Sequence, residues 1–311
     1  MSSGVRPEEG QEVPRKPMTI NRLAEMKADG APIAMITAYD FPSAQVAEEA
    51  GVDVVLVGDS AANCVLGYDS TVPVGLDEMT MLAKAVRRGL KTPLLIGDLP
   101  FGSYEASDGL AIASAQRLVK EAGCDAVKLE GGGTSAARAR AIIDAGIPVM
   151  GHVGLTPQTA TALGGLKAQG RTAAKAIRVA EDAIALDQAG CFAIVIEAVP
   201  EAVTELIVTR VEAPTIGIGA GNETAGQVLV LHDLAGINHG HVAKFVKRYA
   251  DVRSEMLRGV TGYVDEVRNG VFPAPEHVYS VDPSELEGLR QRLNREDLEP
   301  SYSWDWEPFS Q

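Results

Sequence analysis

The chain has 311 residues, of which 46% are hydrophobic, and a formal net charge of −14. This apolar fraction is typical of a soluble globular protein with a substantial core. The acidic charge argues against nucleic acid or an anionic membrane as partner, because both require basic patches. The three cysteines, Cys64, Cys124 and Cys191, lack the spacing of metal ligands, and we expect reduced thiols.

Residues 1–17 are polar and interrupted by prolines, which predicts a disordered N-terminal arm. They contain no signal-peptide pattern. No run in the chain approaches the roughly 20 apolar residues that a bilayer-spanning helix needs. We therefore expect a cytoplasmic protein. A short helix is predicted over residues 19–30, with Gly30 as its stop signal.

From residue 32 onward, apolar runs alternate with helical patterns. The predicted strands cover residues 32–40, 52–60, 92–100, 125–130, 147–154, 191–200 and 213–221, with a fainter eighth over 227–233. The predicted helices cover residues 41–51, 76–89, 107–123, 137–146, 172–190, 200–211 and 241–259.

The apolar runs are continuous rather than alternating, as expected for parallel strands covered on both faces. Eight strand–helix units in series favour a closed (β/α)8 TIM barrel over residues 18–278. A doubly wound open sheet is the alternative, because strand order is not visible in a sequence.

Residues 279–311 form an acidic C-terminal extension of different character. Ser284 and Glu287 have capping-box spacing and predict one more helix. The final stretch holds both tryptophans, Trp304 and Trp306. This tail either docks on the barrel or a neighbouring subunit, or frays without a role.

Polar residues stand where the predicted strands end, and barrel enzymes place their catalytic residues at this edge. In chain order they are Asp40, Asp59, Ser60, Asp98, Lys128, Glu130, His152 and Glu197. Any one carboxylate alone is explained as well by a helix N-cap or by solvation. A shared site becomes the stronger hypothesis only because several converge on one rim.

Lys128 and Glu130 lie two apart in the apolar run DAVKLE and therefore share a face. A buried ion is costly unless it is paired or binds a metal. Asp59, Asp98 and Glu130 occupy corresponding positions of consecutive strands, and such close carboxylates need counter-charge.

Lys128 supplies one positive charge, and a divalent cation would supply the rest. Ligation by oxygen alone indicates Mg²⁺. We expect Glu130 to face the cation, directly or through water, and Lys128 to face a negative charge of the substrate. His239-Gly-His241 lacks zinc partners and is interpreted as a loop or helix cap.

Glu197 ends the apolar run CFAIVI, where burial would raise the pKa of a carboxyl and suit it to act as a general base. His152 is either a hydrogen-bonded rim residue or a substrate contact. The glycine-rich stretch 216–226 indicates close backbone packing around a ligand, with a phosphate site as the weaker option.

Several motifs together resemble the ketopantoate hydroxymethyltransferase family. They are ITAYD, LVGDSAANCVLGYDSTVPV, GDLPFGSY, VKLEGG, GHVGLTPQ, IEAVP and IGIGAGNETAGQVLVLHD, within residues 18–277. The resemblance implies a (β/α)8 barrel of the phosphoenolpyruvate-binding superfamily and a homo-oligomer, commonly a decamer. It implies transfer of a one-carbon unit from 5,10-methylenetetrahydrofolate to 3-methyl-2-oxobutanoate through a Mg-stabilised enolate, giving 2-dehydropantoate for pantothenate synthesis.

The resemblance also implies roles for single residues. Asp59 and Asp98 would hold Mg²⁺, and Glu130 would complete the metal surroundings. Ser60 and Lys128, with the two aspartates, would contact the 2-oxo acid. Glu197 would be the general base.

Two other classes remain as alternatives. Mg-dependent lyases or mutases of the isocitrate lyase and phosphoenolpyruvate mutase type also stabilise enolates, but many use a cysteine in a KKCGH-like loop that this chain lacks. A non-catalytic metabolite-binding barrel would be expected to have lost part of the acidic set, whereas this chain retains all of it.

Overall fold

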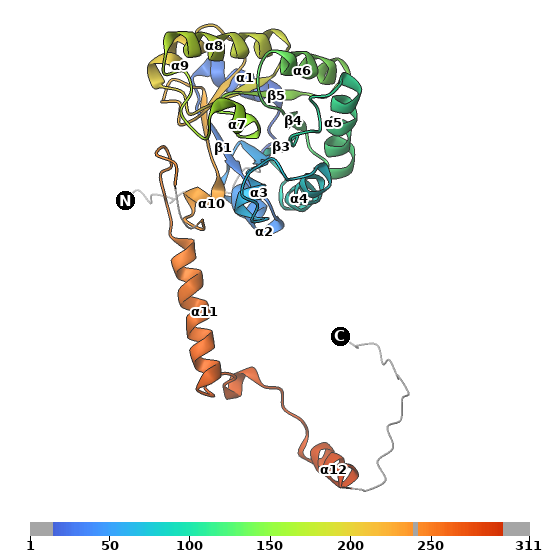
Figure 1. Ribbon diagram of the computed structural model, residues 1–311. Coiled ribbons are helices and arrows are strands. Elements are labelled where there is room, and N and C mark those ends of the chain that lie inside the picture. The colour runs from blue at the N-terminus through green and yellow to red at the C-terminus, as the bar shows by residue number, and fades with distance from the viewer. Residues whose placement is uncertain (1–14, 239–241, 295–311) are drawn as a thin grey trace, which may run out of the picture. The chain divides into compact units, whose positions relative to one another are not determined.

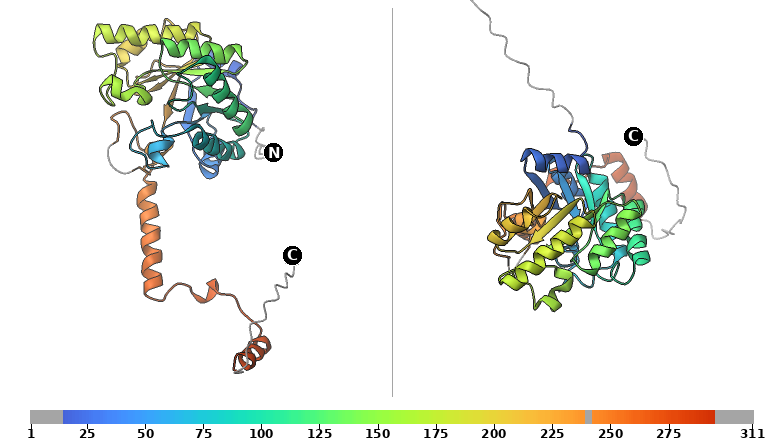
Figure 2. Two further views of the ribbon diagram at one scale, coloured as in Figure 1. Left: turned by 45° about the vertical axis from the view of Figure 1, so that its right-hand side comes forward. Right: turned by 90° about the horizontal axis from the view of Figure 1, so that it is seen from above.

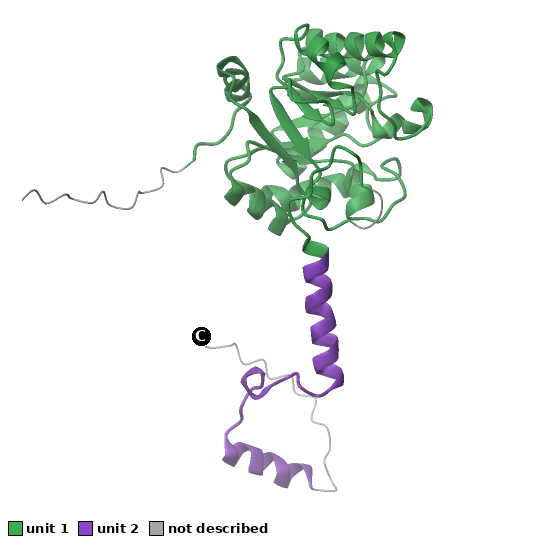
Figure 3. Cartoon of the chain, turned by 90° about the vertical axis from the view of Figure 1, so that its left-hand side faces the viewer, with its two compact units in different colours: residues 1–253 green, residues 254–311 purple. Residues whose placement is uncertain are grey.

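The computed structural model describes residues 15–238 and 242–294. The chain divides into two compact units, residues 1–253 and residues 254–311 (Figure 3). The predictions for residues 1–14, for His239 and His241, and for Trp304 and Trp306 lie outside the described residues. No helix in the described ranges is both long and apolar enough to span a membrane.

The first unit is built on eight parallel strands that close into a barrel in sequence order (Figure 1). They are β1 Ile33–Thr37, β2 Val54–Val57, β3 Leu94–Asp98, β4 Ala126–Lys128, β5 Val149–Gly154, β6 Ala193–Glu197, β7 Thr215–Ile218 and β8 Gly226–Leu229. Strand β8 pairs with β1, which closes the ring. The barrel prediction is confirmed, and the open-sheet alternative is wrong.

Helices surround the strands on the outside (Figures 1 and 2). The longer ones are α1 Ile20–Asp29, α2 Phe41–Ala50, α4 Leu76–Gly89, α5 Asp108–Ala122, α6 Thr134–Asp144, α8 Ala173–Gln188 and α9 Glu201–Val208. Short helices α3 Ala61–Cys64, η1 Pro157–Thr159, α7 Ala160–Leu163 and α10 Leu231–Leu234 lie in the connections. Gly30, Gly51 and Gly123 end their helices in the left-handed conformation, which glycine adopts at little cost.

The barrel interior is filled by every second residue of the strands. Its apolar layer includes Ile33, Met35, Val54, Leu56, Leu94, Ile96, Ala126 and Met150, and Leu23 and Met26 of α1 belong to the same cluster. Because strand side chains alternate between faces, Asp98 follows Ile96 inward and Lys128 follows Ala126. The apolar layers therefore give way to charged side chains at the carboxyl ends of the strands.

The segment after β7 differs from the prediction. The eighth strand ends at Leu229, and residues 231–234 form α10 instead of continuing it. Residues 242–251 are not helical, so the predicted helix 241–259 is wrong there, and α11 covers Val252–Arg268. Within this segment the Tyr249 N–H, which a helix would direct to residue 245, donates to the Leu234 carbonyl at 2.9 Å. The first two N–H groups of α11, those of Val252 and Arg253, donate to the carbonyls of residues 235 and 236 at 3.0 and 3.2 Å.

The second unit contains most of α11, then η2 Pro275–His277 and α12 Pro283–Leu293. Helix α12 confirms the helix predicted in the C-terminal extension. Its N-cap is Asp282, whose Oδ1 accepts from the Ser284 N–H at 2.8 Å, so the predicted cap by Ser284 is wrong. Ser284 lies inside the first turn, so the free N–H groups there are capped by the Asp282 carboxylate, which precedes the helix.

All three cysteines are free thiols, as predicted. Cys124 and Cys191 are buried beside strands β4 and β6, and Cys64 is half-buried at the end of α3.

Candidate active site

A cavity of about 620 Å³ opens at the carboxyl ends of the strands. The structure brings all seven predicted site residues to its lining: Asp59, Ser60, Asp98, Lys128, Glu130, His152 and Glu197. They come from the ends of strands β2 to β6, so the barrel geometry unites side chains that lie far apart in sequence.

Asp98 and Lys128 form a buried ion pair inside this cavity. Lys128 Nζ lies 2.7 Å from both carboxylate oxygens of Asp98. Burial opposes the charge of Lys128, but Asp98 and Glu130 outweigh it and raise the pKa of the lysine, which therefore stays charged. A negatively charged substrate group that contacts Lys128, as expected, would share its ammonium with Asp98.

Asp59 lies beside the pair, because its backbone N–H donates to Asp98 Oδ2 at 3.1 Å. Burial and the neighbouring charges of Asp98 and Glu130 raise the pKa of Asp59 well above its usual value. Burial also raises the pKa of Asp98, against the opposing effect of Lys128. The single ammonium of Lys128 thus compensates the charge of the two aspartates only in part.

His152 links two carboxylates across the cavity. Its Nδ1 is hydrogen-bonded to Glu130 Oε1 at 3.2 Å. Its Nε2 lies 3.2 Å from Glu197 Oε2, an ion-pair distance, although the ring is not aligned for a hydrogen bond there. Burial and Lys128 act to lower the pKa of His152, but the two carboxylates outweigh them and raise it to about 9. His152 is therefore a cation at neutral pH.

Glu130 is committed to protein partners. Besides the bond to His152, its Oε2 accepts from the Gln158 backbone N–H at 3.0 Å. Burial would raise the pKa of Glu130, but His152, Lys128 and Gln158 outweigh it and lower the pKa. Glu130 thus remains ionised.

Glu197 is the most accessible of the charged residues compared here, which all line the cavity. Its side chain is 16% exposed, whereas those of Asp98, Lys128, Glu130 and His152 are between 1% and 4% exposed. It ends β6 and is followed by Ala198, the only described non-glycine residue with a positive φ, at 50°. The chain turns sharply after Glu197, which leaves the carboxylate facing the cavity.

Ser60 begins the turn into α3 behind Asp59. Its Oγ lies 2.7 Å from the Tyr39 hydroxyl, so the serine is held in place by a buried phenol. Burial raises the pKa of Tyr39, which keeps that hydroxyl protonated.

Gln158 is a site residue that the sequence analysis missed. Its Nε2 donates to Asp59 Oδ2 and to the Leu99 carbonyl, both at 3.0 Å, and its Oε1 accepts from the Tyr104 hydroxyl at 2.8 Å. Both residues end motifs quoted above, GHVGLTPQ and GDLPFGSY. The polar side chain at the end of each motif is the sequence signal that could have indicated Gln158 and Tyr104 as site residues.

Two other sequence features have structural roles. Asp40 caps α2 and forms a capping box with Ser43, so it stays outside the site. In the glycine-rich stretch, a Cβ on Gly219 would meet the Phe245 ring at 2.5 Å, and the Asn222 N–H donates to Glu201 Oε1 at 3.2 Å. These glycines allow close packing against protein side chains, and the loop offers little to a phosphate.

The charges of the cluster fit a divalent cation. Four carboxylates face two cations, Lys128 and protonated His152. In the described parts of the chain, no three His, Cys, Asp or Glu side chains form a ready-made ligand set. Mg²⁺ commonly binds only one or two carboxylates and keeps several waters. The adjacent aspartates Asp59 and Asp98, which share the one ammonium of Lys128, meet that requirement.

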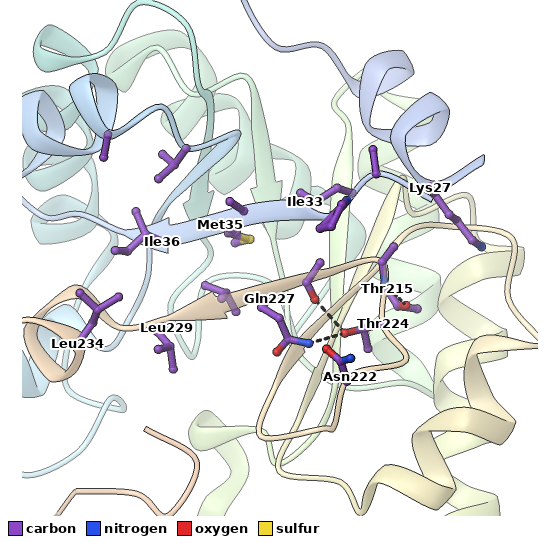
Figure 4. Close-up of a pocket in the computed structure, with 18 of the residues that line it drawn as sticks. Lys27, Ile33, Met35, Ile36, Thr215, Asn222, Thr224, Gln227, Leu229 and Leu234 are labelled. Atoms are coloured by element: carbon purple, nitrogen blue, oxygen red, sulfur yellow. Dashed lines mark hydrogen bonds between the residues drawn. The ribbon is translucent and has the colours of Figure 1, made fainter. Parts of the chain in front are cut away.

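A second cavity, of about 1020 Å³, lies along β1 and β8 (Figure 4). Its lining is mostly apolar, and Thr224 bonds the Gln227 side chain and the Gly226 carbonyl there. Lys27 lines it too, but its Nζ binds backbone carbonyls of residues 211–213. This cavity holds none of the predicted site residues, and its side chains offer no convergent acid–base group.

Fold and site together define a (β/α)8 barrel with buried carboxylates, one lysine and one histidine gathered at the carboxyl ends of its strands, the place where barrel enzymes hold their catalytic residues. A family model for ketopantoate hydroxymethyltransferase matches residues 17–275. The chain belongs to this family.

Two relatives illustrate the similarity. The 3-methyl-2-oxobutanoate hydroxymethyltransferase of Heliobacterium modesticaldum is 51% identical over 274 residues, which cover 88% of this chain and 99% of that protein. The 3-methyl-2-oxobutanoate hydroxymethyltransferase 1, mitochondrial, of Arabidopsis thaliana is 48% identical over 289 residues, 91% of this chain and 83% of that protein.

Solved structures of other enzymes share the fold. A phosphonopyruvate hydrolase in complex with oxalate and Mg²⁺ superposes with a TM-score of 0.56 at 13% identity, covering 88% of this chain and 96% of that chain. A 2,3-dimethylmalate lyase of the phosphoenolpyruvate mutase and isocitrate lyase superfamily gives 0.52 at 12% identity, covering 88% and 98%. At this level of identity the likeness extends to the barrel alone.

Proposed function

We propose that this enzyme transfers a hydroxymethyl unit from 5,10-methylenetetrahydrofolate to 3-methyl-2-oxobutanoate, with uptake of one water, to give 2-dehydropantoate for pantothenate synthesis. The names of the relatives and the family match support this reaction. The observation that carries the proposal is the contrast in the cluster: Glu197 reaches the cavity, while Asp59 and Asp98 form a buried acidic pair beside Lys128.

Glu197 is the general base in this scheme. It removes the C3 proton of the bound oxo acid, and the resulting enolate carbon attacks the methylene carbon of the folate. The two C–N bonds of that methylene break, water supplies the product hydroxyl, and tetrahydrofolate leaves with the C3 proton and the remaining water proton on its two nitrogens. His152 Nε2 lies 3.2 Å from Glu197 Oε2, an ion-pair distance that keeps the two side chains side by side. A placed acid–base group typically contributes about 10² to 10⁴ in rate.

The anionic end of the oxo acid binds at the other side of the cluster. Ser60 donates to it, and Lys128, held by Asp98, stabilises negative charge that develops on the keto oxygen. The two aspartates take part in the same subsite. Because the Lys128 side chain is only 4% exposed, water screens its charge weakly and the stabilisation is strong.

Asp59 and Asp98 would hold Mg²⁺, with Glu130 behind them acting through bound water. The ion would supply Lewis-acid polarisation of the keto group. We also propose that the protein is a cytoplasmic homo-oligomer, with a decamer as the expected size, which light scattering coupled to size-exclusion chromatography measures directly.

The proton-abstraction step can be tested without folate. The protein is incubated in D₂O with 3-methyl-2-oxobutanoate and Mg²⁺, and the C3 proton is followed by NMR. We expect metal-dependent exchange in the wild type and a loss of about 10² to 10⁴ in rate in Glu197→Gln. Glu205→Gln is the matched control, since Glu205 is exposed on α9 and should leave the rate unchanged.

Exchange at the wild-type rate in Glu197→Gln would remove Glu197 from the mechanism. If wild-type protein shows no exchange, with or without added tetrahydrofolate, the proposed reaction is wrong.

A further inference from the structure

The cavity extends well beyond the residues that the oxo acid needs. Past Ser60 its wall continues along the end of α3, the following loop and the segment after α10, with Cys64, Ser70, Thr71, Asp233 and Asn238 in the lining. A volume of about 620 Å³ is in the range of sites for drug-sized ligands. A small branched oxo acid fills only the catalytic part, so the outer part is free for a larger molecule.

One polar group in this outer part has no partner. Thr71 lines the cavity and is only 6% exposed, yet its Oγ1 is buried and forms no hydrogen bond with any described residue. A buried hydroxyl without a partner is costly, because it has lost its bonds to water. A bound ligand with a polar edge would satisfy it.

A second polar group is held in position for a ligand. Asn238 Nδ2 donates to Asp233 Oδ1 at 2.7 Å and also lies 3.4 Å from Cys64 Sγ. This bridge fixes the Asp233 carboxylate against the cavity wall. Its Oδ2 accepts from no residue in the described ranges, so it remains available.

A carboxylate in this setting matches the 2-amino-4-oxo-pyrimidine ring of a pterin. That ring presents two adjacent N–H donors, at the ring nitrogen and at the 2-amino group. A carboxylate is an acceptor-only group and can take both hydrogens side by side.

The remaining lining suits the rest of a folate. Leu166 is 71% exposed and offers an apolar surface to an aromatic linker, and Phe245 lines the same cavity. Lys167 and Lys244 are exposed beside them. Both lysines line this cavity, and their charges match the carboxylates of a glutamate tail.

We propose that the outer part of the cavity is the binding site of the one-carbon donor, with Asp233 recognising the pterin ring, Thr71 making an additional polar contact, and Lys167 and Lys244 meeting the glutamate tail. This inference rests on the proposed function. It assigns the folate to the side of the cavity lined by α3, the loop after it, Asp233 of α10 and Asn238.

The test is the affinity of 5-formyltetrahydrofolate, a stable folate, measured by calorimetry in the presence of oxo acid and Mg²⁺. We expect Asp233→Asn to weaken binding by about tenfold to a hundredfold, since one charge-assisted pair is lost. The same variant should raise KM for methylenetetrahydrofolate and leave KM for the oxo acid unchanged. Asp69→Asn is the matched control, because exposed Asp69 lines the same cavity and should change affinity less than twofold.

Thr71→Val provides an independent variant in case Asp233→Asn fails to fold. We expect it to weaken folate binding severalfold while its melting temperature stays equal or rises, since a buried unpaired hydroxyl is removed. A purely structural role for Thr71 would lower the melting temperature and leave folate affinity unchanged.

Wild-type affinity in both Asp233→Asn and Thr71→Val would overturn the assignment. If the wild type exchanges the C3 proton in D₂O but neither variant affects folate binding, only this inference fails. If wild-type protein neither exchanges the proton nor binds folate, the proposed function itself fails.

Discussion

Asp98 and Lys128 are cross-strand partners at the ends of β3 and β4, and the lysine Nζ lies equally close, 2.7 Å, to both oxygens of the aspartate. Both side chains are almost completely buried. Removing one partner from such a pair leaves an uncompensated charge in the protein interior, which costs far more than loss of a surface pair.

Lys128→Met should therefore lower the free energy of unfolding by about 3–5 kcal/mol in guanidinium titrations. Lys84→Met is the control, since Lys84 is 45% exposed and pairs with Glu121 at 3.8 Å. Loss of that surface pair should cost at most about 1 kcal/mol. A similarly small loss for Lys128→Met would mean that Asp98 is neutral in the folded protein.

The raised pKa of His152 predicts a specific dependence of stability on pH. The protonated form is favoured in the folded state, so its contribution is complete below about pH 6.5 and is lost as the pH rises through about 9. The difference in unfolding free energy between wild type and His152→Gln should shrink by about 3 kcal/mol over that interval, measured with a chelator present.

His232 provides the opposite control. Burial lowers its pKa, against the opposing effects of Asp40 and Asp233. The difference between wild type and His232→Gln should therefore change only as the pH falls below about 6.5. Equal pH profiles for the two histidine variants would contradict the assigned environments.

Gly154 keeps the backbone of Glu197 in place. Its φ is +93°, and a Cβ there would lie 2.3 Å from the Glu197 carbonyl oxygen. Gly154→Ala should displace the proposed base and reduce C3-proton exchange by about 10²-fold, the usual effect of an ångström-scale misplacement.

Gly164→Ala is the control for backbone strain, because an added Cβ there causes strain without the steric clash expected in Gly154→Ala. Gly164 has φ +79°, but no atom lies within 4 Å of an added Cβ. The variant should lose about 1–2 kcal/mol of stability and exchange at the wild-type rate. If both alanine variants exchange equally fast, contact with the Glu197 backbone is irrelevant to turnover.

Gln158 holds several buried polar groups at once. Gln158→Leu would leave Asp59, the Leu99 carbonyl and the Tyr104 hydroxyl without its side-chain amide. Unsatisfied buried groups cost about 1–3 kcal/mol each, so a clear fall in melting temperature is expected. Tyr104→Phe removes one bond from the glutamine together with the contacts of the Tyr104 hydroxyl to the Glu130 backbone, so it should also lower the melting temperature. A wild-type melting temperature in Gln158→Leu would contradict the role assigned to the glutamine.

The barrel and the core of the site were predictable because they follow from local patterns. Inward alternation places Asp98 after Ile96 and Lys128 after Ala126, and closure of the sheet brings the strand ends together. A single sequence shows where a residue lies in a predicted strand and what its side chain can do chemically. These two facts were enough to predict the charged residues at the strand ends.

Other features depend on contacts between distant segments. Gln158 reaches the cluster from η1, and Tyr104 reaches it from the loop after β3. Residues 242–251 carry a helical pattern, but the Tyr249 N–H bonds to the distant Leu234 carbonyl instead of to a helical partner. Hydrophobic periodicity describes each helix or strand separately. It does not show which distant carbonyl a backbone N–H will bond to.

Ala198 holds a backbone angle that glycine would adopt with less strain, and a Cβ in this region costs about 1–2 kcal/mol. An engineer seeking a more heat-tolerant enzyme would choose this position early, since a glycine there removes the penalty. The same change would also give more freedom to the backbone beside Glu197, the proposed general base. At Ala198, a gain in thermal stability would therefore be expected to come with a loss of turnover rate.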